Sequence, residues 1–459
     1  MPSVFIKTYG CQMNERDSEA VAAQLVAKGY SLAPAEGTAD VVLLNTCSVR
    51  DAAEQKAIGK MHGLAAEVRR HRPNVVLGFM GCMAQSRGQA LLDRLPDVDL
   101  VVGTQKFHRT AEYLDEIFSG KRNKICDVGE EEGSEATIRE HILAGNARTR
   151  SVTGFVSIMQ GCNQYCTFCI VPYTRGQERS RTIPDIVGEC RELAARGVKE
   201  ITLLGQIVTS YGKREIGVRD GRSAFVQLLE AVHEIEGLER LRFTSPHPKG
   251  YGDDLVEAYG RLPKLCESAH IPMQSGSDRI LKLMHRGYTR AGCLAIIQKL
   301  RRIQPRIGIT TDIIVGFPGE TENDFEATLS LAQEAAFDNA YIFKYSPRKD
   351  TPAATMPDQV PQAIKEERNQ RLLNVVNEIG ARKYEAQVGK CVEILVEGPS
   401  RRNPARLQGR TRTNKIVVFE GSERQIGELL ALKILRAGSF TLYGDPAIVN
   451  LDIDNSLSQ

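Results

Sequence analysis

Residues 155–172 read Phe155-Val-Ser-Ile-Met-Gln-Gly-Cys162-Asn-Gln-Tyr-Cys166-Thr-Phe-Cys169-Ile-Val-Pro172, a short apolar strand that leads into a loop with three cysteines. Their Cys-x-x-x-Cys-x-x-Cys spacing suits three thiolates on three corners of a 4Fe-4S cube. Structural zinc sites take four protein ligands, and ferredoxin clusters add a fourth cysteine. Neither pattern fits this loop. The spacing therefore predicts a cluster whose fourth iron is open to a small molecule, and three buried structural thiols are the alternative.

Strand and helix patterns alternate around this loop, from about residue 148 to about residue 383. The predicted strands are residues 155–159, 201–204, 241–244, 268–271, 309–315 and 340–343, with helices such as 184–196 and 291–302 between them. Six strands with helical crossovers suit a partial (β/α)6 barrel, in which ligands bind at the carboxyl ends of the strands. Turns at those ends supply the predicted cofactor-binding residues Gly205, Gln206, Ser245, Gln274, Gly316 and Glu320.

The first hundred residues contain three more cysteines, each placed after a predicted strand. The strands are residues 4–8, 41–44, 75–79 and 99–102, with helices at 18–28 and 51–70, and Cys11, Cys47 and Cys82 follow the first three strands. In an open parallel sheet the carboxyl ends of the strands lie on one edge, where ligand sites form. We therefore expect a second 4Fe-4S cluster with three protein ligands. Isolated core cysteines or an incomplete zinc site are the alternatives.

The last 75 or so residues change character. Residues 392–396, 415–419 and 432–435 look like short antiparallel strands of a small β-barrel. Between Gly398 and Ile416 the chain has several basic side chains and no acidic one, so we expect this face to bind an RNA backbone. A solvated charged surface is the alternative. The predicted RNA-binding residues are Arg401, Arg402, Arg410, Arg412, Lys415 and, just after the cysteine loop, Arg175.

Length and composition limit the number of domains, the extent of a nucleic-acid surface and the location of the protein. A chain of 459 residues is too long for one ordinary core. The net charge of only +3 means that any nucleic-acid surface must be local. The N-terminus has no signal pattern, no apolar run approaches a membrane span, and the cysteines indicate metal chemistry over disulfides, so we expect a cytoplasmic protein. The predicted domains are residues 1–120, 148–383 and 384–450, with an acidic linker at 121–147.

The motifs around all six cysteines resemble those of the radical SAM methylthiotransferases. They are Thr8-Tyr-Gly-Cys-Gln-Met-Asn14, Asn45-Thr-Cys-Ser-Val-Arg50, Gly81-Cys-Met-Ala-Gln85 and the Cys162 loop continued to Gly176, with the aromatic Phe168 before the last cysteine. The resemblance covers nearly the whole chain. It implies an N-terminal cluster domain, a radical SAM barrel and a C-terminal TRAM domain. It also implies that Cys11, Cys47 and Cys82 hold an auxiliary cluster and that Cys162, Cys166 and Cys169 hold the cluster that binds S-adenosylmethionine (SAM), beside Phe168.

The resemblance further implies the reaction and the partners. SAM would serve twice, as methyl donor and as source of a 5′-deoxyadenosyl radical, to place a methylthio group on carbon 2 of the dimethylallyl adenosine at tRNA position 37. The partners would be a tRNA anticodon stem-loop, a low-potential electron donor such as flavodoxin or ferredoxin, and a sulfur source, and the protein would be a monomer. Related enzymes act on threonylcarbamoyl adenosine or on a ribosomal protein, but their first motif differs at Tyr9. An iron–sulfur RNA-binding sensor without turnover is the alternative from another class.

One segment departs from the family pattern. After the strand that ends near Leu204 the family usually has Gly-Gln-Asn-Val-Asn, whereas this chain has Gly205-Gln-Ile207-Val-Thr209. Two amides at the carboxyl end of a barrel strand are therefore missing. A lost hydrogen bond that leaves a buried polar partner costs roughly 1–3 kcal/mol, so this departure predicts weaker binding if those amides contact the cofactor.

Overall fold

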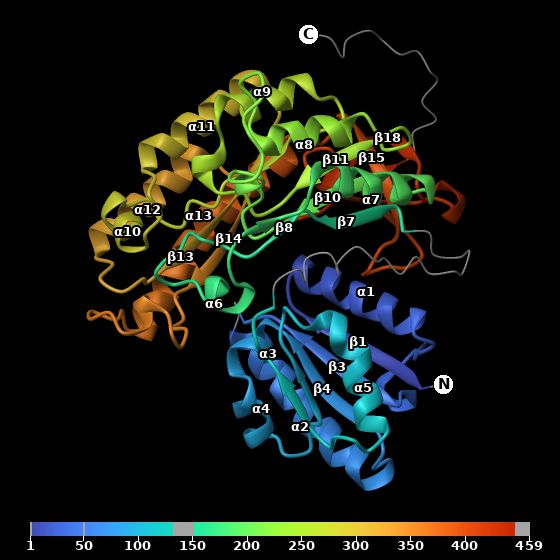
Figure 1. Cartoon of the computed structure of the whole chain (residues 1–459). Helices are drawn as coiled ribbons and strands as arrows, with labels where there is room; N and C mark the ends of the chain where they lie inside the picture. The colour runs from blue at the N-terminus through green and yellow to red at the C-terminus, as the bar shows by residue number, and fades with distance from the viewer. Residues whose placement is uncertain (1, 49–50, 132–150, 446–459) are drawn as a thin grey trace.

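The computed structural model describes residues 2–48, 51–131 and 151–445, which form three domains (Figure 1). An N-terminal α/β domain lies against a larger central α/β domain, and a small β-barrel packs on the far side of the central one. The predicted fold class is therefore confirmed. None of the helices in the described ranges combines the length and apolar character needed to span a bilayer.

The N-terminal domain is a six-stranded parallel sheet with helices on both faces. Its strand order is β2-β1-β3-β4-β5-β6. The strands are β1 Ser3–Tyr9, β2 Ser31–Leu32, β3 Val41–Thr46, β4 Val76–Gly81, β5 Leu100–Val102 and β6 Ile125–Asp127. The helices are α1 Gln12–Ala27, α2 Asp51–His71, α3 Cys82–Arg87, α4 Gln89–Arg94 and α5 Thr110–Phe118. The strands β3 and β4 are buried throughout, which is why they read as continuous apolar runs.

The boundary predicted for this domain at residue 120 needs correction. The strand β6 pairs with β5 and completes the sheet, so Cys126 lies in an edge strand and not in a linker. The acidic composition after Asp127 concealed this short strand. Residues 132–147 of the predicted linker, residues 148–150 and residues 446–450 lie outside the described ranges.

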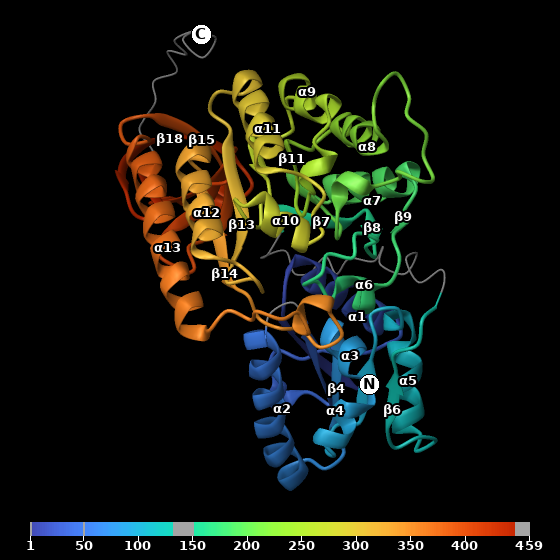
Figure 2. The same cartoon turned by 90° about the vertical axis from the view of Figure 1, so that its left-hand side faces the viewer.

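The central domain has six parallel strands with helical crossovers, as predicted (Figure 2). They form two three-stranded sheets, β11-β10-β7 and β12-β13-β14, joined through a single bridge between Leu241 and Leu265. The strands are β7 Thr153–Ser157, β10 Glu200–Leu204, β11 Arg240–Phe243, β12 Ser268–His270, β13 Gly308–Val315 and β14 Asn339–Lys344, and the short strands β8 Met159–Gln160 and β9 Arg179–Ser180 form a separate antiparallel pair. The helices are α6 Val171–Arg175, α7 Ile183–Ala195, α8 Ala224–His233, α9 Asp253–Arg261, α10 Asp278–Leu283, α11 Arg290–Ile303, α12 Glu322–Ala335 and α13 Gln362–Glu385.

The C-terminal domain is a closed five-stranded barrel in the order β15-β16-β17-β19-β18. Its strands are β15 Cys391–Pro399, β16 Leu407–Thr411, β17 Ile416–Phe419, β18 Leu429–Ala437 and β19 Leu442–Asp445. All neighbours are antiparallel except β17 and β19. The turn between β16 and β17 docks on the central domain, where Arg242 donates hydrogen bonds to the carbonyls of Thr411 (2.8 Å) and Arg412 (2.9 Å). Arg240, the first residue of β11, donates to the Arg410 carbonyl, and Gly308, the first residue of β13, packs against Thr413, so the barrel covers the amino-terminal ends of these central strands.

Candidate active site with two cysteine sets

The first cysteine set lies at one edge of the N-terminal sheet. Cys11 caps α1 directly after β1, Cys47 follows β3, and Cys82 begins α3 directly after β4. The three strands are neighbours in the sheet, and the Cys47 amide donates to the Tyr9 carbonyl at 2.9 Å. The interaction of the Cys11 and Cys47 thiols, and of the Cys11 and Cys82 thiols, agrees with this placement. The sheet thus brings together three cysteines that are far apart in the sequence.

Two buried amides position this set. The Asn14 side chain donates to the Asn45 side-chain oxygen at 3.0 Å, and the Asn45 side chain donates to the Asn14 carbonyl at 2.8 Å. Both residues are fully buried. Because Asn14 lies in the first turn of α1 and Asn45 in β3, their reciprocal bonds fix Cys11 relative to Cys47. Both residues lie in the motifs around Cys11 and Cys47, but the motifs alone predict no role for either.

The electrostatics of this set depend on one arginine of the other domain. Arg175, at the end of α6, donates from Nε to the Cys82 sulfur at 3.2 Å and pairs with Asp17 of α1 at 2.6 Å. A hydrogen bond from Cys47 lowers the pKa of the Cys11 thiol to about 6, and the charge of Arg175 acts in the same direction. Burial raises the pKa of Cys82, against the effect of Arg175. Arg175 therefore lies inside the domain junction, and its predicted contact with RNA is corrected.

The second cysteine set lies in the loop between β8 and α6. The Cys162 amide donates to the Gly176 carbonyl at 3.0 Å, and the Cys169 amide donates to the Cys166 carbonyl at 2.9 Å, so the loop folds back on itself. Burial, together with the charge of the neighbouring Cys166, raises the pKa of Cys162 to about 11 and that of Cys169 to about 12. A bound metal would have to displace these protons, since thiolates are the ligands. Phe168 contacts Phe317 edge to face at 6.4 Å and anchors the loop.

A second arginine contacts this set. Arg286 donates to the Cys166 sulfur at 3.1 Å and to the Tyr288 hydroxyl at 2.9 Å. The Tyr288 ring packs against the His247 ring at 5.3 Å. Burial and the charge of Arg286 lower the pKa of His247 to about 3, so this imidazole is neutral. Its Nδ1 accepts from the Lys249 amide at 3.3 Å, so the proton is on Nε2.

Several buried polar atoms at the carboxyl ends of the central strands lack a hydrogen-bond partner within the described residues. They are Gln160 Nε2, Gln206 Oε1, His247 Nε2 and Glu320 Oε1. They come from four places, which are the end of β8 and the loops after β10, β11 and β13. Buried polar groups are rarely left unpaired, so this edge is built to receive a polar ligand. The sequence predicts Gln206 and Glu320 as cofactor contacts and gives no such role to Gln160 and His247, although Gln160 lies two residues before Cys162 and His247 two residues after Ser245.

The other predicted cofactor residues mainly shape the backbone at this edge. Ser245 and Gln274 adopt positive φ of 57° and 65°, and Gln274 continues the pairing with β13 through its backbone. Glu320 Oε2 accepts from the Gly316 amide at 2.7 Å and pairs with Arg368 of α13 at 2.8 Å. One oxygen of Glu320 therefore closes its own loop, while Oε1 has no partner within the described residues, so its predicted cofactor contact stays a prediction. Burial raises the pKa of Glu320 to about 7.

The segment that departs from the family pattern has a local explanation. The Thr209 hydroxyl accepts from the His247 amide at 3.0 Å and lies 3.4 Å from the His247 carbonyl, to which it donates. Ile207 is buried. Position 209 therefore still supports the turn after β11 through a hydroxyl, while position 207 contributes packing.

Most of the basic residues predicted to bind RNA are used inside the protein. Arg412 pairs with Glu267 at 2.7 Å and donates to two carbonyls of the central domain. Lys415 is buried against Asp338 at 2.7 Å, and Arg410 pairs with Glu397 at 2.9 Å. The predicted RNA contacts of Arg412 and Lys415 are corrected, because their side chains hold the terminal barrel on the central domain. Arg401 and Arg402 remain exposed.

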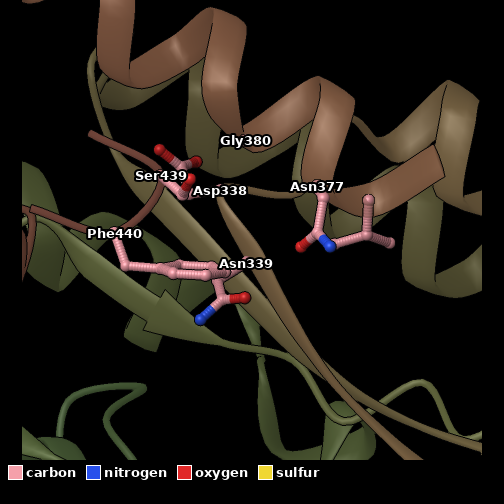
Figure 3. A pocket seen from close by; sticks show the side chains of 7 residues that line it. Asp338, Asn339, Asn377, Gly380, Ser439 and Phe440 are labelled. Carbon is pink, nitrogen blue, oxygen red and sulfur yellow. The ribbon is translucent and has the colours of Figure 1, made fainter. Parts of the chain in front are cut away.

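No three Cys, His, Asp or Glu side chains in the described ranges converge on a single point as ligands of one metal ion would. In a cluster each thiolate binds a different iron, so such convergence is not required. One cavity of about 110 Å³ lies elsewhere, between β14, α13 and the loop that carries Ser439 and Phe440 (Figure 3). It borders Asn339, the first residue of β14, and so lies at the end of the strand away from the cysteines. Its lining contains no thiol or histidine.

Comparison with protein families divides the chain in the same way. Residues 3–103 match an uncharacterized protein family (UPF0004), residues 156–332 match the radical SAM superfamily, and residues 385–447 match the TRAM domain. Among solved structures, the radical S-adenosylmethionine methyltransferase TsrM from Kitasatospora setae, with cobalamin and a [4Fe-4S] cluster bound, has a TM-score of 0.58 at 14% identity and covers 77% of each chain. This likeness concerns the fold.

Two curated relatives match over nearly their whole length. Both are named tRNA-2-methylthio-N(6)-dimethylallyladenosine synthase. The protein from Akkermansia muciniphila is 54% identical and covers 97% of this chain and 99% of its own. The protein from Opitutus terrae is 53% identical and covers 97% of each chain. The chain therefore belongs to the tRNA-2-methylthio-N(6)-dimethylallyladenosine synthase family of radical SAM methylthiotransferases.

Proposed function

We propose that this chain adds a methylthio group to carbon 2 of N(6)-dimethylallyl adenosine at position 37 of tRNA. The observation that carries the proposal is the pair of three-cysteine sets that meet through α6. This helix begins two residues after Cys169 and ends at Arg175, which contacts Cys82 of the other set. In both views α6 lies beside α3, the helix that begins with Cys82 (Figures 1 and 2).

The side chains present fit the cofactors of the family, which are two 4Fe-4S clusters and SAM. Thiolates are the ligands that such clusters take. Cys11, Cys47 and Cys82 would hold one cluster, and Cys162, Cys166 and Cys169 the other. The unpaired polar atoms of Gln160, Gln206 and His247 lie at the strand ends where SAM would bind. When bound, these groups supply the methyl group and the radical that the unactivated C–H bond of adenine requires.

The protein's own residues orient and enclose the reactants. Phe168 and Phe317 pack the cysteine loop against the turn after β13, which limits access of water to the loop. The neutral His247 offers an N–H donor at Nε2 and no positive charge, so it can bind an anionic or carbonyl oxygen of a ligand. The paired Asn14 and Asn45 hold the first set in register with α1. No side-chain acid–base pair is needed for this chemistry.

The RNA contacts follow from what the terminal barrel leaves exposed. The TRAM match supports tRNA binding, and we assign direct backbone contacts to Arg401 and Arg402. The target base would have to leave the anticodon stack to reach the cysteines, and such flipping costs a few kcal/mol. We further propose that the protein acts as a monomer in the cytoplasm, with a flavodoxin or ferredoxin as electron donor and a separate sulfur source. Binding of an anticodon stem-loop by an R401A/R402A variant should weaken, and unchanged affinity would remove these residues from the interface.

The direct test is anaerobic incubation of the reconstituted protein with SAM, dithionite and tRNA that carries dimethylallyl adenosine, followed by nucleoside mass spectrometry. The expected result is a gain of one methylthio group together with 5′-deoxyadenosine. The same tRNA without the dimethylallyl group is the matched control and should gain nothing. Deoxyadenosine without a modified nucleoside would overturn the substrate, and neither product from a protein with both clusters would overturn the activity.

A further inference from the structure

Each cysteine set contacts one buried arginine. Arg175 donates from Nε to the Cys82 sulfur at 3.2 Å, and Arg286 donates from Nη1 to the Cys166 sulfur at 3.1 Å. Their side chains are nearly excluded from water, with residue exposures of 3% for Arg175 and 7% for Arg286. The two contacts are alike in donor, acceptor and distance.

The two arginines differ in their counter-charge. Arg175 binds the fully buried carboxylate of Asp17 through two nitrogens, at 2.6 and 3.3 Å, so its charge is neutralised locally. Arg286 has no carboxylate among its interaction partners in the described part of the chain, and its second hydrogen bond goes to the neutral Tyr288 hydroxyl. The positive charge of Arg286 helps to lower the pKa of the neighbouring His247, which therefore stays neutral. An arginine without a carboxylate partner therefore contacts Cys166, and an arginine paired with a carboxylate contacts Cys82.

This difference matters for electrons. Reduction adds one negative charge to an iron–sulfur cluster, and both a hydrogen bond to a ligand sulfur and a nearby positive charge stabilise that charge. In a buried site the charge effect is screened far less than in water. An arginine without a counter-ion should therefore raise the reduction potential of its cluster more than an arginine that is paired with an aspartate.

We propose that Arg286 and Asp17 act as positioning residues that set the two clusters at different potentials, with the cluster on Cys162, Cys166 and Cys169 the easier to reduce. The external donor is oxidised by one electron, and that electron then resides on the cluster held by Cys162, Cys166 and Cys169, here called the SAM-side cluster. Arg286 raises the potential on that side, and Asp17 cancels the same effect of Arg175 on the other side. The inference rests on the proposed function, because it assumes that the six cysteines ligate clusters.

The helix α6 brings the two cysteine sets close together, so a difference in reduction potential would decide which cluster receives the electron. Since α6 links the Cys169 loop to the Cys82 contact, the two sets are close neighbours, and an electron could reduce either cluster. Distance alone would not direct it. The negative charge of Asp17 makes the cluster on Cys11, Cys47 and Cys82 harder to reduce, without a change in the number or type of its ligands.

The experiment is an anaerobic redox titration of the reconstituted full-length protein, followed by electron paramagnetic resonance. Triple Cys→Ala variants of one set isolate the cluster on the other set. In the chain that keeps Cys162, Cys166 and Cys169, R286Q should lower the reduced-to-oxidised ratio at fixed potential at least tenfold, which is about 59 mV for a one-electron couple. In the chain that keeps Cys11, Cys47 and Cys82, D17N should raise that ratio, because Arg175 is then uncompensated.

The matched control is R371Q, which removes an arginine that pairs with Glu322, Glu326 and Glu367 on the surface. It should move neither potential. An unshifted potential in R286Q, or equal shifts of both clusters, would overturn the inference. If R286Q fails to assemble its cluster, D17N still decides, because an unchanged or lower auxiliary potential contradicts the proposal. Absence of either cluster from the unsubstituted protein, by iron content and spectrum, would instead mean that the proposed ligand assignment is wrong.

Discussion

The two cysteine sets offer the same three thiols but are built in opposite ways. Cys162, Cys166 and Cys169 belong to one loop that folds on its own backbone. Cys11, Cys47 and Cys82 follow three strands and meet only because β1, β3 and β4 are neighbours in a parallel sheet. A local set can form as soon as its loop closes, whereas the distributed set requires the whole domain to be folded. The comparison teaches that the same donor chemistry can depend on local or on long-range structure.

The largest effects should come from the cysteines, and they should differ between the sets. C166A should reduce formation of 5′-deoxyadenosine to background, because the cluster proposed to bind SAM would lose a ligand. C82A should leave cleavage of SAM measurable but abolish the methylthiolated nucleoside. Each variant should lose about half of the iron of the unsubstituted protein, if each set holds one of two equal clusters. Deoxyadenosine and nucleoside products are measured by mass spectrometry in the same reactions.

Cys126 provides the control for that comparison. It lies in the edge strand β6 and belongs to neither set. C126A should keep both the iron content and both products. Methylthiolated product from C82A would contradict the division of labour between the two sets, whereas loss of iron from C126A would mean that the first set is wrongly assigned.

A second, smaller effect should come from the glycines that precede the cysteines. Gly161 has φ +80°, and a Cβ there would lie 1.8 Å from the Gln177 carbonyl oxygen. Gly81 has φ +96°, and its Cβ would lie 2.2 Å from the Asn45 side-chain oxygen and 2.8 Å from the Thr46 carbonyl. A residue with a side chain in such backbone costs on the order of 1–3 kcal/mol before any overlap. Because the closest overlap of G161A, at 1.8 Å, is with a backbone oxygen, whereas that of G81A, at 2.2 Å, is with a side-chain oxygen, G161A should destabilise the protein more than G81A, as measured by urea unfolding.

The control separates backbone strain from overlap. Gly29 has φ +94°, close to that of Gly81, and a Cβ there would meet nothing within 4 Å. G29A should therefore show only the conformational cost. If G81A is no worse than G29A, the contacts around Cys82 are not tight. Iron content should fall only in G81A and G161A, each from its own cluster.

Sequence reasoning succeeded where a pattern is local or follows from strand order. The spacing of the Cys162 loop is contained in eight residues, and the strand ends of the first domain follow from apolar runs that the structure confirms as β1, β3 and β4. The closed terminal barrel also followed from composition and short strands. These features depend on neighbours in sequence or on a regular topology.

Long-range pairs explain what sequence reasoning missed. Arg412 and Lys415 stand in a segment without acidic residues, yet their partners Glu267 and Asp338 lie 145 and 77 positions away. Arg175 finds Asp17 across 158 positions. An arginine-rich segment therefore looked like an RNA surface when much of it is a domain junction. The strand β6 was missed because its three residues are too few to show the alternation of apolar and polar side chains that marks a strand.

The smallest predicted effect concerns the buried His247, whose ring packs against Tyr288, a partner of Arg286 beside Cys166. The pKa of His247 is lowered to about 3 from its ordinary value of 6.5, mainly by burial, with Arg286 acting in the same direction. Between these values the unfolded chain binds more protons at this residue than the folded chain. The contribution of His247 to stability is therefore fully present above about pH 6.5 and is lost as the pH falls towards 3. The slope is at most about 1.4 kcal/mol per pH unit.

Unfolding in urea at several pH values between about 5 and 7 should show this contribution as a difference between the unsubstituted protein and H247N. The free energy of unfolding of the unsubstituted protein should fall more steeply on acidification than that of H247N. The exposed His62 of α2 supplies the reference variant, H62N, which changes the same residue type outside the site. Parallel curves for the unsubstituted protein and H247N would mean that His247 is hydrated or paired in solution. The effect of the Arg286 charge on His247 would then lack support. The proposed difference in reduction potential between the two cysteine sets would rest on the pairing of Arg175 with Asp17 alone.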